Sequence, residues 1–404
     1  MLQDLNKIIK YFMEVSSFED MSRLPSLKLF DDHVCNMLNQ LSKAIRNDKE
    51  AKKYSDIVTF SFFCRRSNIE RLKCQYDTDN RIGKGLSFHI APSNVPINFA
   101  YSLAAGLLAG NSCIVRVSSK DFPQIRIICS LLKEIDMAPE LRKYLAVISY
   151  AHDREITDYF SALCSLRVIW GGDETIRIIR KSLLPPRCTE ITFADRYSIC
   201  VIHAGNMLRI QDLNDIIRAF YNDTYLYDQN ACSSPRLVYW MGDKTDIEQA
   251  RKLFWAALRR YLKDRYVTEP VTAIDKLMMD YKAAMELSNP TIEKTDNNVH
   301  CIMVKSLPDR LQDYACPGGS FIEYASDSLS DLVSVINSKF QTLTYIGLSG
   351  KELADWVISH GLKGIDRIVP VGKAADFSLI WDGYNLIDCM SREVYYEGSK
   401  YDTI

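Results

Sequence analysis

Cys232 and Asn94 are the residues of this chain whose types and surroundings could perform chemistry. Cys232 lies in a polar turn, DQNACSSP, that runs into an apolar stretch at 235–240. Asn94 follows Pro-Ser at the end of another apolar stretch, 86–91. A cysteine thiolate can attack a carbonyl carbon, and an amide N–H can stabilise the oxygen that becomes negative. The two residues therefore suggest acyl transfer at a cysteine.

Each of the two residues also has an ordinary structural interpretation. A cysteine is more often a buried apolar filler than a nucleophile, and asparagine is common in turns. The polar neighbours of Cys232 favour reactivity, because backbone N–H groups of a loop can lower the pKa of a thiol. The place of Asn94 favours function, because ligands of α/β sheets gather at the carboxyl ends of strands. On these residues alone both interpretations stay open.

Strands that alternate with helices must hold these residues in place. From residue 84 onward, apolar runs alternate with helical periodicities, and this alternation predicts βαβ units with parallel strands. The first unit is predicted to have strands at 85–91, 112–117, 144–150, 165–170 and 198–204, with helices at 97–109, 123–135 and 155–164. The second is predicted to have strands at 235–240, 299–304, 320–324 and 341–348, with helices at 211–221, 245–263, 328–338 and 350–360.

The pattern as a whole predicts an α/β protein with two Rossmann-like parallel-sheet domains and a helical N-terminal extension. The extension covers 1–80, where apolar residues recur at helical spacing. The first sheet is expected within 81–205, and the second, with the cysteine, within 206–345. The last segment, 346–404, contains a tail without clear periodicity and is expected to pack back on the domains.

Two further groups of residues could bind an anionic cofactor. Gly171 and Gly172 lie between a predicted strand and helix, where backbone N–H groups can bind phosphate. Their spacing is not GxGxxG and acidic residues follow, so a tight turn with a helix cap explains them equally well. Arg116 and Ser118 end a strand, and a cation there suits an adenosine ribose or a 2′-phosphate. The ordinary alternative for that pair is a solvated strand end.

Charge and cysteine usage argue against several classes of protein. The 404 residues have a formal net charge of −1 and no dense Lys/Arg stripe, which argues against a nucleic-acid binder. The 12 cysteines include no CxxC pair, so a zinc ribbon or a disulfide scaffold lacks its usual spacing. We find no clustered metal-ligand spacing either, and His89 and His203 receive no catalytic role, because a lone histidine near an apolar strand is more often structural.

The apolar segments favour a cytoplasmic location. Cysteines in apolar stretches fit a reducing compartment. The N-terminal residues contain no cleavable apolar segment. The longest apolar region, 96–117, is interrupted by Asn and Gly, which indicates a buried helix and strand rather than a membrane span.

Several stretches together resemble the aldehyde dehydrogenase superfamily, and most closely its acyl-CoA reductase branch, typified by the fatty-acid reductase of bacterial luminescence. These stretches are APSNVPINFAYSLAAGLLAGNSCIVRVSSKD, VIWGGDETI, DQNACSSPRLVYW, QTLTYIG and GIDRIVPVGKAADFSLIWDGYNLI. They cover roughly residues 80–390 and are specific as a combination. The resemblance implies an aldehyde-dehydrogenase-like fold, in which 81–205 binds a dinucleotide and 206–345 is catalytic.

The resemblance also implies a role for each matching residue. It makes Cys232 the nucleophile and Asn94 the oxyanion donor, and it assigns cofactor contacts to Arg116, Gly171 and Gly172. Arg116 stands where many relatives have lysine, which fits NADPH, with NADH as the alternative.

One departure from the superfamily bears on the reaction. Hydrolytic aldehyde dehydrogenases activate water with a glutamate in a Glu-Leu-Gly-Gly-Lys-type stretch. The matching region here, EITFADRYS, has Thr192 at the closest position, with Glu190 two residues earlier on the same strand face. The absence of a water-activating glutamate at this position fits an acyl-cysteine that reacts with hydride rather than with water. Glu190 leaves hydrolysis open as an alternative.

The implied reaction is NADPH-dependent reduction of a fatty-acyl thioester, either an acyl-CoA or an acyl carrier, to an aldehyde through an acyl-cysteine. One alternative is NAD(P)-dependent oxidation of an aldehyde to an acid, and another is a non-catalytic acyl-holding subunit. Relatives act beside an acyl-activating or acyl-transferring partner protein and form homo-oligomers, so the resemblance implies both for this chain.

Overall fold

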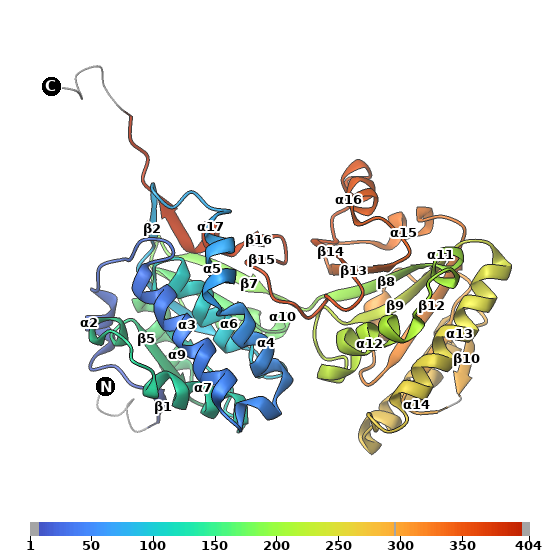
Figure 1. Ribbon diagram of the computed structural model, residues 1–404, viewed down its shortest axis with the longest axis horizontal. Helices are drawn as coiled ribbons and strands as arrows, with labels where there is room; N and C mark the ends of the chain where they lie inside the picture. The colour runs from blue at the N-terminus through green and yellow to red at the C-terminus, as the bar shows by residue number, and fades with distance from the viewer. Residues whose placement is uncertain (1–7, 295, 398–404) are drawn as a thin grey trace. The chain divides into compact units, whose positions relative to one another are not determined.

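The computed structural model describes residues 8–294 and 296–397, which fold as two compact units (Figure 1). Unit 1 comprises the described residues up to Ala194 together with those from Phe377 onward, and unit 2 comprises Asp195–Asp376. Among the described residues, no helix combines the length and the apolar composition needed to cross a membrane.

Unit 1 is built on a six-stranded sheet with the order β1-β5-β4-β3-β6-β7. Its strands are β1 (Lys10–Met13), β3 (Leu86–Ile90), β4 (Ser112–Arg116), β5 (Leu145–Ser149), β6 (Leu166–Trp170) and β7 (Thr189–Phe193). All neighbours pair in parallel except β1, which is antiparallel to β5. Every residue of β3, β5 and β6 is buried, as expected for parallel strands covered on both faces.

Helices cover both faces of this sheet. One face packs against α3 (Asp32–Asn47), α4 (Ser55–Phe63), α5 (Arg66–Lys73), α6 (Asn98–Leu108), α7 (Pro123–Glu134), α8 (Pro139–Arg142) and α17 (Leu386–Met390). The other face packs against α2 (Phe18–Ser22), α9 (Arg154–Leu163) and α10 (Asp173–Ile179). Short elements complete the unit: η1 (Ala51–Lys53), β2 (Arg81–Gly83), β15 (Ile380–Trp381), β16 (Tyr384–Asn385) and β17 (Ser391–Glu393).

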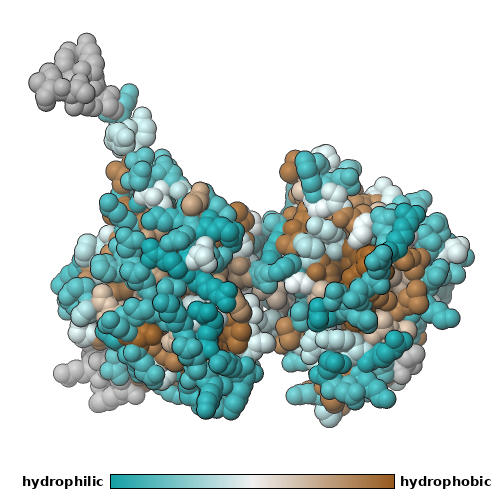
Figure 2. All heavy atoms as spheres, in the orientation of Figure 1, coloured by the Kyte–Doolittle hydropathy of each residue, from teal (hydrophilic) through white to brown (hydrophobic). Residues whose placement is uncertain are grey.

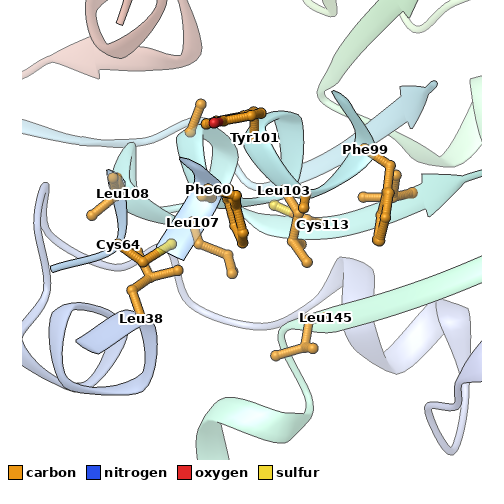
Figure 3. Packing of buried hydrophobic residues seen from close by; sticks show 14 of the residues in the cluster. Leu38, Phe60, Cys64, Phe99, Tyr101, Leu103, Leu107, Leu108, Cys113 and Leu145 are labelled. Carbon is orange, nitrogen blue, oxygen red and sulfur yellow. The ribbon is translucent and has the colours of Figure 1, made fainter. Parts of the chain in front are cut away.

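The helical prediction for the N-terminal segment is confirmed from α2 to α5. In α3, the Asp31 carboxylate accepts hydrogen bonds from the His33 and Val34 backbone N–H groups and caps the helix. Its apolar face meets α4 and α6, where Leu38 and Phe60 lie near Leu107 (Figure 3). Burying each such side chain contributes about 1.5–3 kcal/mol. The strand β1 was not predicted in this segment.

Unit 2 is built on a seven-stranded sheet with the order β10-β11-β12-β9-β8-β13-β14. Its strands are β8 (Tyr197–His203), β9 (Pro235–Met241), β10 (Thr291–Lys294), β11 (His300–Met303), β12 (Ser320–Ser326), β13 (Phe340–Ile346) and β14 (Arg367–Pro370). Among the strands that the structure describes in this sheet, only β10 pairs antiparallel. The helical elements are α11 (Ala204–Leu208), α12 (Leu213–Thr224), η2 (Tyr225–Tyr227), α13 (Lys244–Leu262), α14 (Pro270–Glu286), η3 (Leu311–Tyr314), α15 (Ser330–Val335) and α16 (Gly350–Ser359).

Two features of the order along the chain differ from the predictions. The strand expected at 198–204 to close the first sheet is β8, which lies between β9 and β13 in the second sheet. The prediction was wrong because a buried, mostly apolar strand such as β8 fits the middle of any parallel sheet, and β7 already ends the first one. The tail divides as well: β14 joins unit 2, whereas residues 377–390 return to the core of unit 1.

The boundaries between the compact units differ from those of the expected domains. The units divide at 194/195 and 376/377, whereas the domains were expected to divide at 205/206 and 345/346. The functional assignment of those domains stays a prediction. Figure 2 shows hydrophilic residues over much of the visible face of both units, with hydrophobic side chains reaching the surface in places.

Candidate active site

The Cys232 loop connects η2 to β9 in unit 2. It begins with Asp228 and Gln229, which have φ angles of 51° and 59°. Two consecutive non-glycine residues in the left-handed region cost roughly 1–2 kcal/mol each. Such a turn persists only where its surroundings hold it in place.

Gln229 supplies that support from a fully buried position. Its side-chain Oε1 accepts hydrogen bonds from the backbone N–H groups of Gly319 and Ser320, both at 2.9 Å. Its Nε2 donates to the carbonyl oxygens of Pro235, at 2.8 Å, and Ser320, at 2.9 Å. One side chain therefore ties the start of the cysteine loop to the starts of β9 and β12.

Cys232 is half-buried, and residues of two other strands of the sheet contact it. The side-chain Nε2 of Gln341, in β13, donates to the Cys232 sulfur at 3.3 Å. The hydroxyl of Ser198, in β8, donates to the Cys232 carbonyl oxygen at 2.6 Å and accepts from the Thr342 backbone N–H at 3.2 Å. The structure thus fixes both the sulfur and the backbone of the predicted nucleophile.

A half-buried cation lies in the same region. Arg236 donates to the carbonyl oxygens of Gln229, at 2.7 Å, and Cys316, at 3.1 Å. Burial lowers the pKa of Arg236, and this is opposed by its electrostatic interactions with Tyr197, Cys316 and Cys232. Arginine stays charged in proteins, so its guanidinium favours a thiolate at a cysteine with which it interacts.

Gln341, Ser198, Gln229 and Arg236 were not predicted as site residues. Gln341 opens the QTLTYIG stretch and Arg236 follows the cysteine by four residues, so both belong to quoted motifs. Their roles depend on pairing between distant strands, which no local pattern reveals.

Asn94 lies in unit 1, in the turn that joins β3 to α6. Its side chain is exposed, and the turn is closed by the Asn98 backbone N–H, which donates to the Val95 carbonyl at 3.1 Å. This is the carboxyl end of a central parallel strand, as the sequence predicted. Cys232 belongs to unit 2, and the structure describes each residue within its own unit, so their joint action stays a prediction.

Arg116, the last residue of β4, lines a pocket of about 260 Å³ in unit 1. Its Nη2 donates to the Tyr150 carbonyl at 3.2 Å, and its guanidinium lies 4.9 Å from the centre of the Tyr150 ring. Its buried Nε has no hydrogen-bond partner. Arg154 and Lys181 line the same pocket, so three cations lie around this space.

The other predicted cofactor residues do not line that pocket, as far as the described residues define it. Gly172 caps α10, and the Gly171 N–H donates to the Phe193 carbonyl at 3.1 Å. A Cβ at Gly171 would lie 3.0 Å from the Thr175 side chain, so close packing accounts for this glycine. Ser118 accepts from the Lys120 N–H in a turn. Their cofactor contacts stay predictions.

Glu190, the candidate water-activating base, is held in ion pairs. Its Oε2 accepts from Arg167 Nε at 2.8 Å, and its Oε1 accepts from Arg180 Nε at 2.7 Å. Arg167 is 1% exposed and also donates to the Ser161 hydroxyl at 3.0 Å. Both carboxylate oxygens of Glu190 therefore neutralise cations beside α10, which is a structural role.

The two histidines considered above are also structural. His89 is fully buried between the hydroxyls of Ser102, at 2.7 Å, and Ser87, at 2.9 Å. Burial lowers its pKa to about 3, so it stays neutral near pH 7. His203 caps α11 by accepting from the Asn206 backbone N–H. Within the described part of the chain, no cluster of three His, Cys, Asp or Glu side chains could bind a metal ion.

The fold defined by these two units is that of the aldehyde dehydrogenases. The structure is similar to aldehyde dehydrogenase 21 from Physcomitrella patens, with a TM-score of 0.66, 12% identity, and coverage of 94% of this chain and 87% of that chain. This likeness confirms the predicted fold class.

Within that class, the chain belongs to the acyl-CoA reductase (LuxC) family, whose model matches residues 17–393. Similar proteins include the long-chain acyl-protein thioester reductase of Aliivibrio fischeri, 29% identical over 309 residues, which are 72% of this chain and 61% of that protein. The protein of the same name from Vibrio harveyi is 24% identical over 300 residues, 72% of this chain and 59% of that protein. The chain spans about three fifths of the length of these relatives. The family and the fold together imply a nicotinamide cofactor.

Proposed function

We propose that this protein reduces a fatty-acyl thioester to an aldehyde through an acyl-cysteine at Cys232. The main support is the arrangement around the sulfur, which accepts a hydrogen bond from the Gln341 side-chain amide and interacts with the half-buried Arg236 guanidinium. Similar proteins described as long-chain acyl-protein thioester reductases support the substrate class.

The first step is acyl transfer to the enzyme. The Cys232 thiolate attacks the thioester carbonyl carbon, a new C–S bond forms, and the carrier leaves as a thiolate, which needs little acid catalysis. By the resemblance, the Asn94 amide and a backbone N–H near Cys232 stabilise the oxyanion. Loss of one such donor typically slows a reaction on the order of 10²–10³-fold.

The second step releases the aldehyde. A bound nicotinamide cofactor supplies the hydride that brings the acyl carbon to the aldehyde level. The C–S bond to Cys232 then breaks, the carbonyl re-forms and the thiolate returns. Gln341 and Arg236 stabilise that thiolate in the same way as before the attack, because they are already in place.

The Arg116 pocket suits the adenosine end of that cofactor, and we propose NADPH with NADH as the alternative. Arg116, Arg154 and Lys181 line this pocket and offer positive charge to a 2′-phosphate. The buried Arg116 Nε lacks a hydrogen-bond partner that a phosphate or ribose oxygen would provide. Binding affinities from nicotinamide fluorescence test this: Lys181→Gln should weaken NADPH binding more than NADH binding. Equal weakening of both would remove the basis for NADPH.

The remaining proposals concern substrates and partners. The thioester is an acyl-CoA or an acyl group on a carrier protein, and an acyl-activating or acyl-transferring protein would supply it. A homo-oligomer is proposed as well. Oxidation of an aldehyde to an acid is not favoured, because Glu190 is occupied by Arg167 and Arg180.

The deciding experiment follows NADPH absorbance with acyl-CoAs of several chain lengths, using wild type and Cys232→Ala. We expect NADPH consumption with one aldehyde per NADPH, lost in the variant. Turnover that survives in Cys232→Ala would overturn the acyl-cysteine. If wild type binds acyl groups but consumes NADPH with neither acyl-CoA nor an acyl carrier protein, it is a non-catalytic acyl-holding subunit.

A further inference from the structure

Helix α14 presents an apolar face to solvent. Val271, Ile274, Met278, Tyr281 and Met285 are between 58% and 79% exposed. A surface helix normally turns its apolar stripe toward the core. Here five large apolar side chains on one helix lie outside, and such a patch on a folded protein commonly marks an interaction site.

The inward face of α14 is polar, and hydrogen bonds hold it. Lys276 is 3% exposed, and its Nζ donates to the carbonyl oxygens of Asn297, at 2.5 Å, and Gly318. Asp280 is 4% exposed and hydrogen-bonds His300 Nε2 at 2.6 Å. These contacts set the rotation of α14 about its axis, so the apolar face cannot turn inward without leaving buried polar groups unpaired.

The exposed apolar residues repeat at intervals of three and four, which is the spacing of the a and d positions of a coiled coil. With Val271 as an a position, Ile274 and Tyr281 are d positions, and Met278 and Met285 are further a positions. The 17 residues of the helix give a seam about 25 Å long. Tyr and Met at its centre are residue types enriched in protein interfaces.

The charges beside the seam select its occupant. The e positions hold opposite charges, Asp275 and Lys282, whereas the g positions hold the apolar Leu277 and Ala284. In an antiparallel pair of identical helices, e residues face e residues of the partner. A two-fold axis at Met278 then places Val271 of each copy level with Met285 of the other, and Asp275 of each copy within one residue of the level of Lys282 of the other. A parallel pair would instead place each of these charges beside a g position, where there is no opposite charge.

We propose that α14 pairs with α14 of a second copy of this chain in an antiparallel, two-fold symmetric contact. Such an isologous contact needs a surface complementary to itself, and the reversed charge order along α14 provides it. Lys282 Nζ also donates to the Asp313 carbonyl at 2.9 Å, which leaves two of its three N–H groups for a carboxylate. This proposal does not depend on the proposed reaction.

The test measures molar mass by light scattering and by sedimentation over a range of concentrations. Met278→Lys places two ammonium groups on the two-fold axis and should halve the mass of the assembly or weaken its dissociation constant at least about tenfold, since like charges across an interface cost several kcal/mol. Ile358→Lys is the matched control, because Ile358 is a 76% exposed apolar residue on α16. It should leave the mass unchanged.

A charge exchange separates the antiparallel seam from other contacts. Asp275→Lys and Lys282→Asp should each weaken self-association, because each replaces both attractive pairs by repulsive ones. An equimolar mixture of the two variants should recover the wild-type mass, since both pairs are then attractive again. Thermal unfolding of each variant shows whether it is folded, and NADPH turnover is recorded separately.

Two outcomes would overturn the proposal. A monomeric wild type would exclude a second copy as the occupant, and the face would then belong to another protein or to an acyl chain. A wild-type mass retained by Met278→Lys, or a mixture that fails to associate while both variants are folded, would exclude this seam. Since these readouts do not use activity, they can fail while the proposed reductase reaction holds.

Discussion

The side-chain amide nitrogen of Gln341 lies 3.3 Å from the sulfur of Cys232, although 109 positions separate the two residues. Parallel pairing of β13 with β8, and of β8 with β9, brings them together at one end of the second sheet. Gln341 is 1% exposed, so its amide is held by packing before any substrate arrives. A fixed N–H donor beside the sulfur stabilises negative charge there.

Changing this donor to a carboxylate should therefore slow reaction at the sulfur. In Gln341→Glu, we expect the pH at which Cys232 is half-labelled by iodoacetamide to rise by about one unit or more, because a like charge opposes thiolate formation. Gln341→Met, which only removes the donor, should shift it less. Mass spectrometry of the peptide that contains Cys232 separates its labelling from that of the other cysteines. Identical pH profiles for all three proteins would refute a role for this contact.

Gln229 should be essential for the stability of the cysteine loop. Gln229→Ala removes four hydrogen bonds from a buried site, and unsatisfied buried groups cost about 1–3 kcal/mol each, so the unfolding free energy should fall by at least about 2 kcal/mol. Gln229→Gly loses the same bonds but accepts the φ of 59°, so it should be about 1 kcal/mol less destabilised than the alanine variant. Urea unfolding measures both.

The matched control for Gln229 is Gln249→Ala on α13, where the glutamine is exposed and the change should stay within about 0.5 kcal/mol. A Gln229→Ala protein as stable as this control would show that the four contacts are not needed to hold the loop.

How much of this structure can be predicted from the sequence depends on how far apart in the chain the interacting residues lie. Buried strands such as β5 and β6 are mostly apolar, so their existence follows from the local pattern. The sheet to which β8 belongs does not follow from its local pattern. Cys232 and Asn94 are recognisable because motifs surround them. Gln341 and Ser198 are not, because each is a polar residue in a buried strand and contacts the cysteine only after distant strands pair. The helix α14 was missed for another reason: its buried face contains Lys276 and reverses the usual pattern.

Glu190 should matter for stability and not for the choice of product. Glu190→Gln leaves the buried Arg167 without its carboxylate, and breaking a buried ion pair typically costs about 3–5 kcal/mol. Arg180→Gln is the comparison, because that side chain is 56% exposed and its pair should contribute less than about 1 kcal/mol. Chemical unfolding measures both variants. Product analysis should find the same proportion of carboxylic acid with Glu190→Gln as with wild type. Selective loss of acid would restore Glu190 as a water-activating base.

Asp223 should make unit 2 sensitive to pH. Its two carboxylate oxygens accept from the backbone N–H groups of Gly372, at 2.6 Å, and Ala374, at 2.9 Å, and burial raises its pKa to about 7. Between the ordinary value near 4 and this raised value, the folded protein binds a proton that the unfolded chain releases, so its stability falls as the pH rises through that range.

The variant Asp223→Asn tests this, because its side chain cannot titrate. The unfolding free energy of wild type minus that of Asp223→Asn should therefore decrease from about pH 4 to about pH 7, by up to about 1.4 kcal/mol per pH unit, and level off above it. Urea unfolding at a series of pH values measures this difference, with Asp215→Asn on the exposed side of α12 as control. A difference that stays constant with pH, or that increases, would contradict the raised pKa of Asp223.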